Sequence, residues 1–398
     1  MPLQELSQVC EEHYKLYQGE RVIKRICIVV ASEMTVKAFL KQQIIAFSDR
    51  YDVTLVVNTQ QTDFAGQNDL PVKVIPLAIE RTINPVADLR ALFQLIRIFR
   101  QHRFDLVHSV TPKAGLLAML AAKVAGIRFR IHTFTGQVWA TREGFSRLLL
   151  KSMDRLLAAS ATDLLTDSFT QRQFLIDQRV TGAEKLSVLA DGSISGVDTD
   201  RFMPDSNARS DMRKQIGISE NEILLLFLGR LNRDKGVLDL AAAFAKIAVK
   251  LPRLHLLLVG PDEGNLQEVV KSTCAEFVQR VHFIDYTDKP ESCFAAADIF
   301  CLPSYREGFG SVIIEAAACG IPAIGSRIYG ISDAIREGET GLLFEAGNGD
   351  RLAEAIEQLV TNSMLRSQMG AAALKRAQDD FPTKRLVQAW LGYYDGLQ

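Results

Sequence analysis

The feature that most constrains the fold is a rhythm of short apolar runs and helical patterns that occurs twice along the chain. The first series has strand-like runs at residues 26–31, 53–58, 72–76, 106–108, 129–133, 164–167 and 186–189. The second has them at residues 222–229, 254–260, 281–284, 297–302, 322–324 and 341–344. Short apolar runs that alternate with helices are typical of a parallel sheet with helices on its faces. The sequence therefore predicts an α/β protein with two Rossmann-like domains.

A polar segment at residues 196–204 separates the two series, and its closing Pro204 indicates a linker. The predicted first domain is residues 1–195, and the predicted second domain is residues 205–382. Residues 383–398 follow a break at Pro382 and show one more helical pattern. Residues 1–23 are mostly polar with a weak helical pattern, so we assign no fold to them.

Composition favours a protein without membrane-spanning segments. Of the 398 residues, 47% are hydrophobic and 23% are charged, as in water-soluble globular proteins. No apolar stretch reaches the roughly 20 residues that a membrane helix needs. The first twenty residues contain four acids, whereas a secretory signal is basic and apolar. We expect a cytoplasmic location. The cysteines lack metal-ligand spacing and are expected to be buried thiols: Cys10, Cys27, Cys274, Cys293, Cys301 and Cys319.

Two acids, Glu307 and Glu315, lie between a predicted strand and a predicted helix in the second domain. The backbone N–H groups of Phe309, Gly310 and Ser311 are expected at the start of that helix, where unsatisfied donors attract a diphosphate. Glu315 would lie two turns inside the helix and accept hydrogen bonds from the vicinal hydroxyls of a ribose. A strand, a glycine loop and a helix in this order indicate a nucleotide site.

A second polar loop follows the first strand of the second domain and contains Gly229, Arg230, Lys235 and Gly236. Arg230 and Lys235 are expected at the carboxyl edge of the sheet. There they would neutralise a departing diphosphate, whose charge develops as the sugar bond breaks.

With these motifs the chain resembles the retaining glycosyltransferases of family four. Their pattern of two acids separated by seven residues is present at Glu307 and Glu315, and their Gly-Arg and Lys-Gly pairs are present at residues 229–230 and 235–236. The resemblance implies the GT-B architecture, in which two Rossmann-like domains face each other across a cleft and the C-terminal helix crosses back to the first domain. Residues 1–23 lie outside the resemblance.

The resemblance also implies roles for several residues. His132, at a strand end, corresponds to a histidine beside the donor sugar. Tyr286 lies where relatives contact the base with backbone groups. The first loop lacks the glycine pair of many relatives, so Met34 and Thr35 would approach the diphosphate through their backbone alone. His108 is expected to line the cleft floor or to pack.

We expect a retaining transfer of a hexose or N-acetylhexosamine from a nucleotide diphosphate sugar, with His132, Arg230, Lys235 and Glu307 as the catalytic residues. UDP is favoured because most relatives use it. The residues after His132 resemble enzymes of surface-polysaccharide and lipid-linked oligosaccharide assembly, which implies a lipid-linked or polysaccharide acceptor. A sugar-nucleotide epimerase of the same fold and a non-catalytic nucleotide-sugar-binding subunit remain alternatives. No nucleic acid is expected as a partner.

No cofactor and no metal are expected. The single Asp-x-Asp pattern, Asp198 and Asp200, lies in the predicted linker and not after a strand of a nucleotide fold. Arg230 and Lys235 would take over the function of a metal cation.

Charge is unevenly distributed between the two halves. Residues 1–195 hold 24 Lys and Arg against 19 Asp and Glu, and the rest holds 22 against 28. A predicted amphipathic helix at residues 88–103 groups Arg97, Arg100 and Arg103 at its end, and residues 145–157 repeat a basic residue every four positions. Both patterns fit either a core-facing helix with a charged end or docking on anionic lipid at the cytoplasmic face of the inner membrane.

Overall fold

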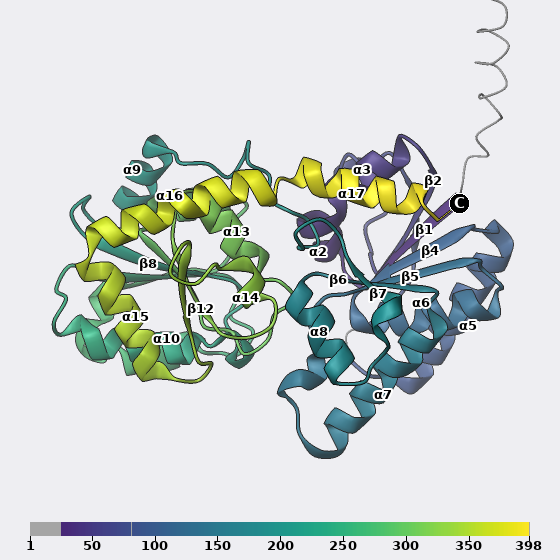
Figure 1. Cartoon of the computed structure of the whole chain (residues 1–398), viewed down its shortest axis with the longest axis horizontal. Coiled ribbons are helices and arrows are strands. Elements are labelled where there is room, and N and C mark those ends of the chain that lie inside the picture. The colour runs from purple at the N-terminus through teal and green to yellow at the C-terminus, as the bar shows by residue number, and fades with distance from the viewer. Residues whose placement is uncertain (1–24, 81, 398) are drawn as a thin grey trace, which may run out of the picture.

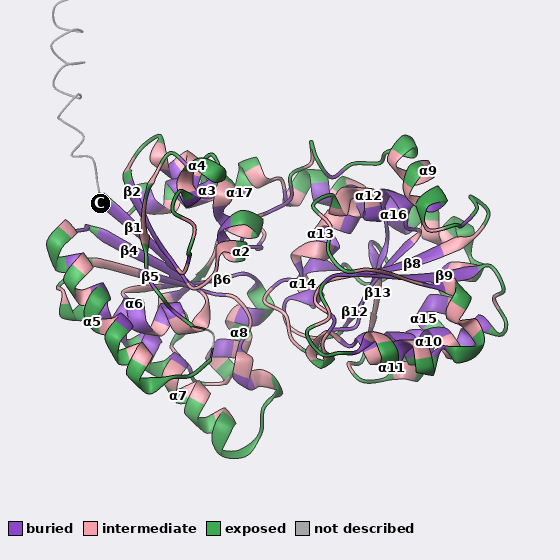
Figure 2. Cartoon of the chain, turned by 180° about the vertical axis from the view of Figure 1, so that it is seen from behind, coloured by how far each residue is buried: buried purple, intermediate pink, exposed green. Residues whose placement is uncertain are grey.

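The computed structural model describes residues 25–80 and 82–397, so Cys10 and the unassigned residues 1–23 lie outside the described residues. Two parallel sheets form the centres of two domains, which lie side by side (Figure 1). The central strands of each sheet are buried and the outer faces of the helices are exposed (Figure 2). The predicted α/β class and GT-B architecture are confirmed. No helix in the described ranges is long and apolar enough to cross a membrane.

The first sheet has seven strands in the order β3-β2-β1-β4-β5-β6-β7. Its strands are β1 (Arg25–Val30), β2 (Asp52–Val57), β3 (Lys73–Pro76), β4 (Leu106–Val110), β5 (Phe129–Phe134), β6 (Asp163–Thr166) and β7 (Leu186–Val188). The helices are α2 (Glu33–Thr35), η1 (Val36–Leu40), α3 (Lys41–Ser48), α4 (Phe64–Gln67), α5 (Pro85–His102), α6 (Pro112–Val124), η2 (Val138–Thr141), α7 (Gly144–Ser160), α8 (Phe169–Asp177) and η3 (Ala183–Lys185). One apolar cluster joins the sheet to α5, α6 and α7, and another joins its opposite face to α3 and α4.

The second sheet has six strands in the order β10-β9-β8-β11-β12-β13. Its strands are β8 (Ile223–Leu228), β9 (Leu254–Val259), β10 (Val281–Ile284), β11 (Ile299–Leu302), β12 (Ala323–Ser326) and β13 (Gly341–Phe344). The helices that follow the linker are α9 (Ser206–Gln215), η4 (Arg233–Lys235), α10 (Val237–Ala248), α11 (Gln267–Thr273), η5 (Ala275–Arg280), α12 (Pro290–Ala296), α13 (Ser311–Ala318), α14 (Ile331–Ala334), α15 (Gly349–Thr361), α16 (Ser363–Asp380) and α17 (Thr383–Asp395). The five cysteines in the described ranges are buried.

The last helix, α17, returns to the first domain, as the resemblance implied (Figure 1). Its Tyr394 stacks on Phe47 of α3 with ring centroids 4.8 Å apart. Two backbone hydrogen bonds hold the chain where it crosses between the domains. The N–H of residue 197 in the linker donates to the carbonyl of Phe381 at 2.8 Å, and the N–H of Thr383 donates to the carbonyl of residue 197 at 2.9 Å.

His108 packs beneath this helix. Its Nδ1 lies 2.6 Å from the Tyr394 hydroxyl, and its Nε2 lies 2.9 Å from Oγ1 of Thr133. Burial lowers the pKa of His108 to about 3, so its imidazole is neutral at physiological pH. Of the two roles expected from the sequence, the structure shows packing.

The two domains touch along one edge. Phe174 of α8 stacks on Tyr329 with centroids 4.5 Å apart, and Oδ1 of Asp333 accepts a hydrogen bond from the backbone N–H of Phe169 at 3.1 Å. The hydroxyl of Ser168 donates to the carbonyl of Gly308 at 3.1 Å. The loop that follows β11 is therefore held directly against the first domain.

Asp167 is buried within this domain contact. A Cβ added to Gly308 would lie 2.7 Å from Oδ2 of Asp167, and Oδ1 has no hydrogen-bond partner among the described residues. Burial raises the pKa of Asp167 to about 8, because the charged carboxylate would lose its hydration there.

This burial gives Asp167 a pH-dependent effect on stability. Between about pH 4, the usual pKa of an unfolded aspartate, and about pH 8, the folded state retains a proton that the unfolded state has lost. Asp167 therefore destabilises the fold increasingly as pH rises through this window. Asp167→Asn keeps the shape and removes the charge, so its unfolding temperature should exceed that of the unmodified protein by a margin that grows from pH 5 to pH 9. The control is Asp200→Asn, an exposed linker acid. A margin that is the same at every pH would contradict this account.

Candidate active site

The reversal of strand order in the second sheet lies between β8 and β11, which pair directly through Leu225 with Ile299 and Leu226 with Phe300. From this point successive strands are added in opposite directions, so the loops that leave the two strands diverge. Ligands of open parallel sheets bind in the crevice at such a point. The loop after β8 contains Arg230 and Lys235, and the loop after β11 contains Glu307.

Lys235 and Glu307 form an ion pair across this point, with Nζ 2.5 Å from Oε1. The hydroxyl of Ser304 donates to the same carboxylate oxygen at 2.9 Å. Asn232 accepts a hydrogen bond from the backbone N–H of Lys235 and so fixes the turn that presents the lysine. The structure thus brings together two residues that are 72 positions apart in the sequence.

Two glycines make this approach possible. Gly236 has φ 68°, and a Cβ there would lie 2.0 Å from the carbonyl oxygen of Pro303, so any other residue would push the two loops apart. Gly310 has φ 83° and precedes α13. No side chain caps α13, so its first N–H groups keep their capacity to bind an anion.

The two residues beside Gly310, both expected to bind the donor, differ in exposure. The ring of Phe309 is buried and lies edge-on to Phe381 at 5.4 Å. Only the backbone of Phe309 can therefore face a ligand. Ser311 is the first residue of α13 and is partly exposed.

Arg230 lies just beyond the carboxyl end of β8, separated from Leu228 by Gly229. Its Nη1 is 2.7 Å from Oε2 of Glu263, in the loop after β9. Arg230 and Lys235 are therefore both paired with carboxylates, and a bound diphosphate would have to compete with Glu263 for the guanidinium.

Glu315 lies in the second turn of α13 and is partly exposed. Its carboxyl has no hydrogen-bond partner in the described part of the chain. Desolvation, and to a lesser degree the nearby Glu291, raise its pKa to about 8, while Arg201 opposes the shift. A carboxyl in this state can be ionised by a ligand that donates hydrogen bonds to it.

His132 lies on β5 in the first domain, with Nδ1 2.9 Å from the hydroxyl of Ser109. Gly115 of α6 makes room for the ring, because a Cβ there would lie 2.3 Å from Cε1 of His132. Burial is the main reason that its pKa falls to about 3, so the imidazole is neutral. The loop that follows this strand reaches the second domain, since a Cβ on Gly136 would lie 3.3 Å from the carbonyl carbon of Glu307.

The other expected donor residues are not brought into this group by any hydrogen bond or ion pair. The N–H of Met34 donates to the hydroxyl of Ser32, and that of Thr35 donates to the carbonyl of Ser32, so both are used within the first turn of α2. Tyr286 follows β10 and is 67% exposed. A hydrogen bond to Asp288 is the main cause that raises the pKa of Tyr286. Their roles in donor binding stay predictions.

The linker acids are engaged elsewhere. Asp198 accepts hydrogen bonds from the backbone N–H groups of Asp200 and Arg201 at 3.1 and 3.2 Å, and Asp200 lies 3.3 Å from Lys384. Among the described residues no group of three or more His, Cys, Asp or Glu side chains is placed to hold a metal ion.

Sequence reasoning missed Ser304, which holds Glu307, and Asp167, which supports the loop next to it. Ser304 lies three residues before Glu307, and a hydroxyl at that spacing from the acid was a signal that the sequence offered. Nothing in the sequence places Asp167 against Gly308, because the two lie in different domains and meet only in the folded chain.

Two family models match the chain, one for each domain. Residues 208–376 match the model of group 1 glycosyl transferases, and residues 40–192 match that of the glycosyl transferase 4-like domain. The first match contains the loops of Arg230, Lys235 and Glu307, and the second contains His132.

Curated relatives include the capsular polysaccharide biosynthesis glycosyltransferase CapM of Staphylococcus aureus, which is 31% identical over 78% of this chain and 81% of its own length. Another is the UDP-Gal:alpha-D-GlcNAc-diphosphoundecaprenol alpha-1,3-galactosyltransferase of Escherichia coli, which is 26% identical over 80% of this chain and 82% of its own.

Among solved structures, Anabaena HepE in complex with UDP and glucose is similar in fold. The TM-score is 0.76 at 21% identity, and the match covers 94% of this chain and all of HepE. The likeness extends over both domains. Taken with the two family models and the similarity to CapM, it shows that this chain belongs to the group 1 glycosyl transferases and has a glycosyl transferase 4-like first domain.

Proposed function

We propose that this glycosyltransferase moves a hexose or N-acetylhexosamine from a UDP-sugar to a lipid-linked or polysaccharide acceptor, with retention of configuration and without a metal ion. The observation that supports this most directly is the Lys235–Glu307 pair beside the uncapped start of α13. A cation, an acid and free N–H groups at one switch point suit a diphosphate that carries a sugar.

In the proposed reaction the bond between the anomeric carbon and the β-phosphate oxygen breaks. Lys235 and Arg230 stabilise the negative charge that develops on the departing UDP. The acceptor hydroxyl attacks from the same face, and its proton passes to the β-phosphate oxygen, so that configuration is retained. Glu307 and the neutral His132 orient the sugar, and no protein nucleophile is needed.

UDP as the nucleotide is supported by two relatives. HepE binds UDP and glucose, and the E. coli relative is named for a UDP-galactose donor. Glu315 would hold the ribose, the N–H groups of Phe309, Gly310 and Ser311 the diphosphate, and the loop at Tyr286 the base.

A lipid-linked acceptor is supported by the same E. coli relative, whose named acceptor is a diphosphoundecaprenol. An enzyme that uses such a molecule works at a membrane, and we place this protein peripherally on the cytoplasmic face of the inner membrane. The alternatives give different products. An epimerase would convert the donor sugar without an acceptor, whereas a binding subunit would show neither transfer nor slow donor hydrolysis.

Removal of either cation should impair the chemical step. Lys235→Ala and Arg230→Ala are each expected to reduce kcat/KM by the equivalent of about 2–4 kcal/mol, because each removes a preorganised positive charge from the leaving diphosphate. Donor hydrolysis or transfer to a lipid acceptor provides the assay. Lys246→Ala is the control: it removes a lysine of the second domain that pairs with Asp350, and it should leave kcat/KM unchanged. Normal kinetics in both site variants would exclude this site.

Nucleotide binding should depend on the ionisation of Glu315. If ribose hydroxyls donate to its carboxylate, binding must expel the proton that the free carboxyl holds below its pKa of about 8. The affinity for UDP should therefore increase from pH 6.5 to pH 8 and level off above. Titration calorimetry in buffers of different ionisation enthalpy would detect the released proton. In Glu315→Gln both the pH dependence and this proton release should disappear. An affinity independent of pH in the unmodified protein would argue against the contact.

Metal removal should leave the rate almost unchanged, because Arg230 and Lys235 provide the positive charge and both acids of the Asp-x-Asp pattern are engaged in the linker. Initial rates are to be measured with excess EDTA and then with added magnesium or manganese. A complete loss with EDTA that either ion restores would refute the metal-free mechanism.

A further inference from the structure

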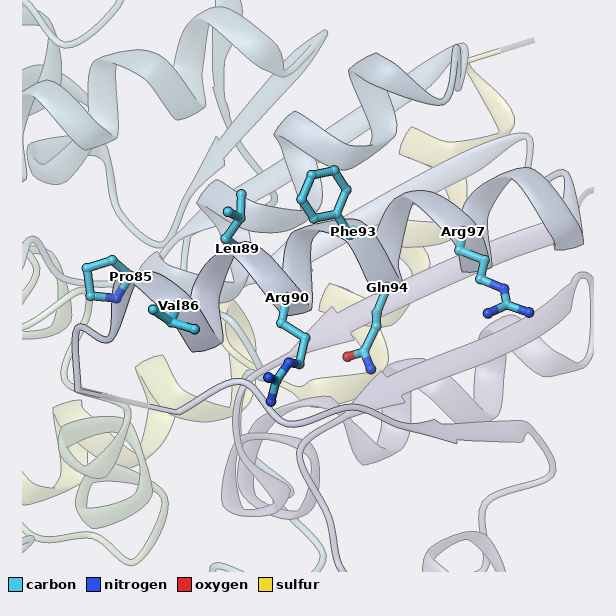
Figure 3. A pocket seen from close by; sticks show the side chains of 7 residues that line it. All are labelled: Pro85, Val86, Leu89, Arg90, Phe93, Gln94 and Arg97. Atoms are coloured by element: carbon cyan, nitrogen blue, oxygen red, sulfur yellow. The ribbon is translucent and has the colours of Figure 1, made fainter.

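Helix α5 exposes apolar side chains that a helix on a protein surface normally buries. Asn84 accepts a hydrogen bond from the N–H of Ala87 and, with Pro85 next, starts the helix. In its first half Val86 is 71% exposed, Leu89 53% and Phe93 62%. Figure 3 shows Leu89 and Phe93 projecting from one side of the helix, beside an open hollow of about 640 Å³. The opposite side of the helix is in the core.

Helix α7 has the same character. Phe145 is 78% exposed, Leu148 59% and Leu149 40%, all in its first two turns. It packs against α6, which also packs against α5, so the three helices form one layer on the outer face of the first sheet (Figures 1 and 2). The two exposed apolar segments lie on helices that flank α6.

This layer presents positive charge without matching negative charge. The acids of the three helices are turned into the protein: Asp88 pairs with Lys113 at 2.5 Å, and the buried Asp154 accepts from the indole N–H of Trp139 at 2.7 Å. The exposed cations of α5 and α7 are Arg90, Arg97, Arg100 and Arg155, whereas Arg147 and Lys151 are partly buried and donate hydrogen bonds to Oε1 of Gln178. Desolvation, and then the neighbouring arginines, lower the pKa of Lys151, as expected in a cluster of like charges.

The exposed apolar turns of α5 and α7 lie at the end of the first domain that faces the candidate active site. In a parallel sheet the helix that follows a strand begins near that strand's carboxyl end. Helix α5 follows β3 and α7 follows β5, the strand of His132, so the exposed apolar turns of both helices lie towards the carboxyl edge of the sheet, where the loop after β5 approaches Glu307 of the second domain. If a bilayer contacts these turns, the head group of a lipid-linked sugar in that bilayer lies near the candidate active site.

We propose that the outer surface of α5–α7 docks on an anionic bilayer, with Leu89, Phe93, Phe145 and Leu148 inserted at the interface and the cations of the two helices on lipid head groups. This inference rests on the proposed lipid-linked acceptor. The occupant is a bilayer because apolar tips and unbalanced cations occur together, and that combination complements an anionic lipid surface.

The structure refines the expectation from sequence, which named two candidate docking segments: residues 88–103, with Arg97, Arg100 and Arg103 at the end, and residues 145–157. Arg103 follows the end of α5, where the chain enters β4 at the edge of the sheet away from the cleft. The insertion site lies instead in the first half of α5, and α7 contributes a second contact.

The test is co-flotation of the full chain with phosphatidylcholine vesicles, with and without phosphatidylglycerol. The unmodified protein should float with the anionic vesicles and much less with the neutral ones. Leu89→Ser with Phe93→Ser, and Arg97→Ser with Arg100→Ser, should each weaken the partition coefficient about tenfold or more. Val249→Ser with Met364→Ser removes two equally exposed apolar residues of the second domain and should change nothing.

Circular dichroism and thermal unfolding would show that each variant is folded. Failure of the unmodified protein to float with anionic vesicles, or equal flotation of all variants, overturns the proposal. Light scattering gives a further outcome that overturns the proposal. If the unmodified protein is a dimer and Leu89→Ser with Phe93→Ser is a monomer, the surface of α5–α7 is a subunit interface. UDP binding by lipid-free protein distinguishes failure of the membrane inference from failure of the proposed function. If the protein binds UDP but not vesicles, only the membrane inference fails. If it binds vesicles but not UDP, the proposed transferase activity fails.

Discussion

The reversal of strand order between β8 and β11 is the constraint on which the site depends. Parallel strands end at one edge of a sheet, and only at the reversal do their loops leave in opposite directions. Lys235 and Glu307 meet there because their two strands are neighbours, although they belong to different βα units. Gly236 and Gly310 then let the backbone approach closely enough for the pair to form and for the start of α13 to remain open.

The cations Arg230 and Lys235 of the candidate site are held in ion pairs within the protein. Lys235 is bound to Glu307 and Arg230 to Glu263, so neither cation faces the cleft without a counter-charge. This arrangement lowers the cost of desolvating two positive groups before the nucleotide arrives. A diphosphate brings more negative charge than one carboxylate, and it can therefore take over these cations as it binds. In the proposed reaction Glu307 would then leave Lys235 and contact the sugar.

Sequence reasoning predicted the two sheets because buried parallel strands are almost continuously apolar, and it found Glu307 and Lys235 through their loops. It could not predict that His108 binds Tyr394, since that contact joins residues 286 positions apart. It also could not reveal Asp167 at the domain contact. The N–H groups of Met34 and Thr35 are a different case. Sequence reasoning predicted that both groups face the diphosphate. Ser32 before Glu33 is a typical helix cap, however, and this local pattern could have predicted that both groups are used within α2.

The domain contact and the donor site share a segment of chain. Glu307 pairs with Lys235, the next residue packs on Asp167 and accepts a hydrogen bond from Ser168, and Phe309 supports the start of α13. Any movement that separates the domains must therefore pull on the loop that holds the acid, and it must also hydrate Asp167. Because a buried, unpaired carboxyl favours its neutral form, separation of the domains would be coupled to proton release at this residue. In this fold the protonation of one residue outside the predicted site can thus affect how long the donor loop stays in its observed position.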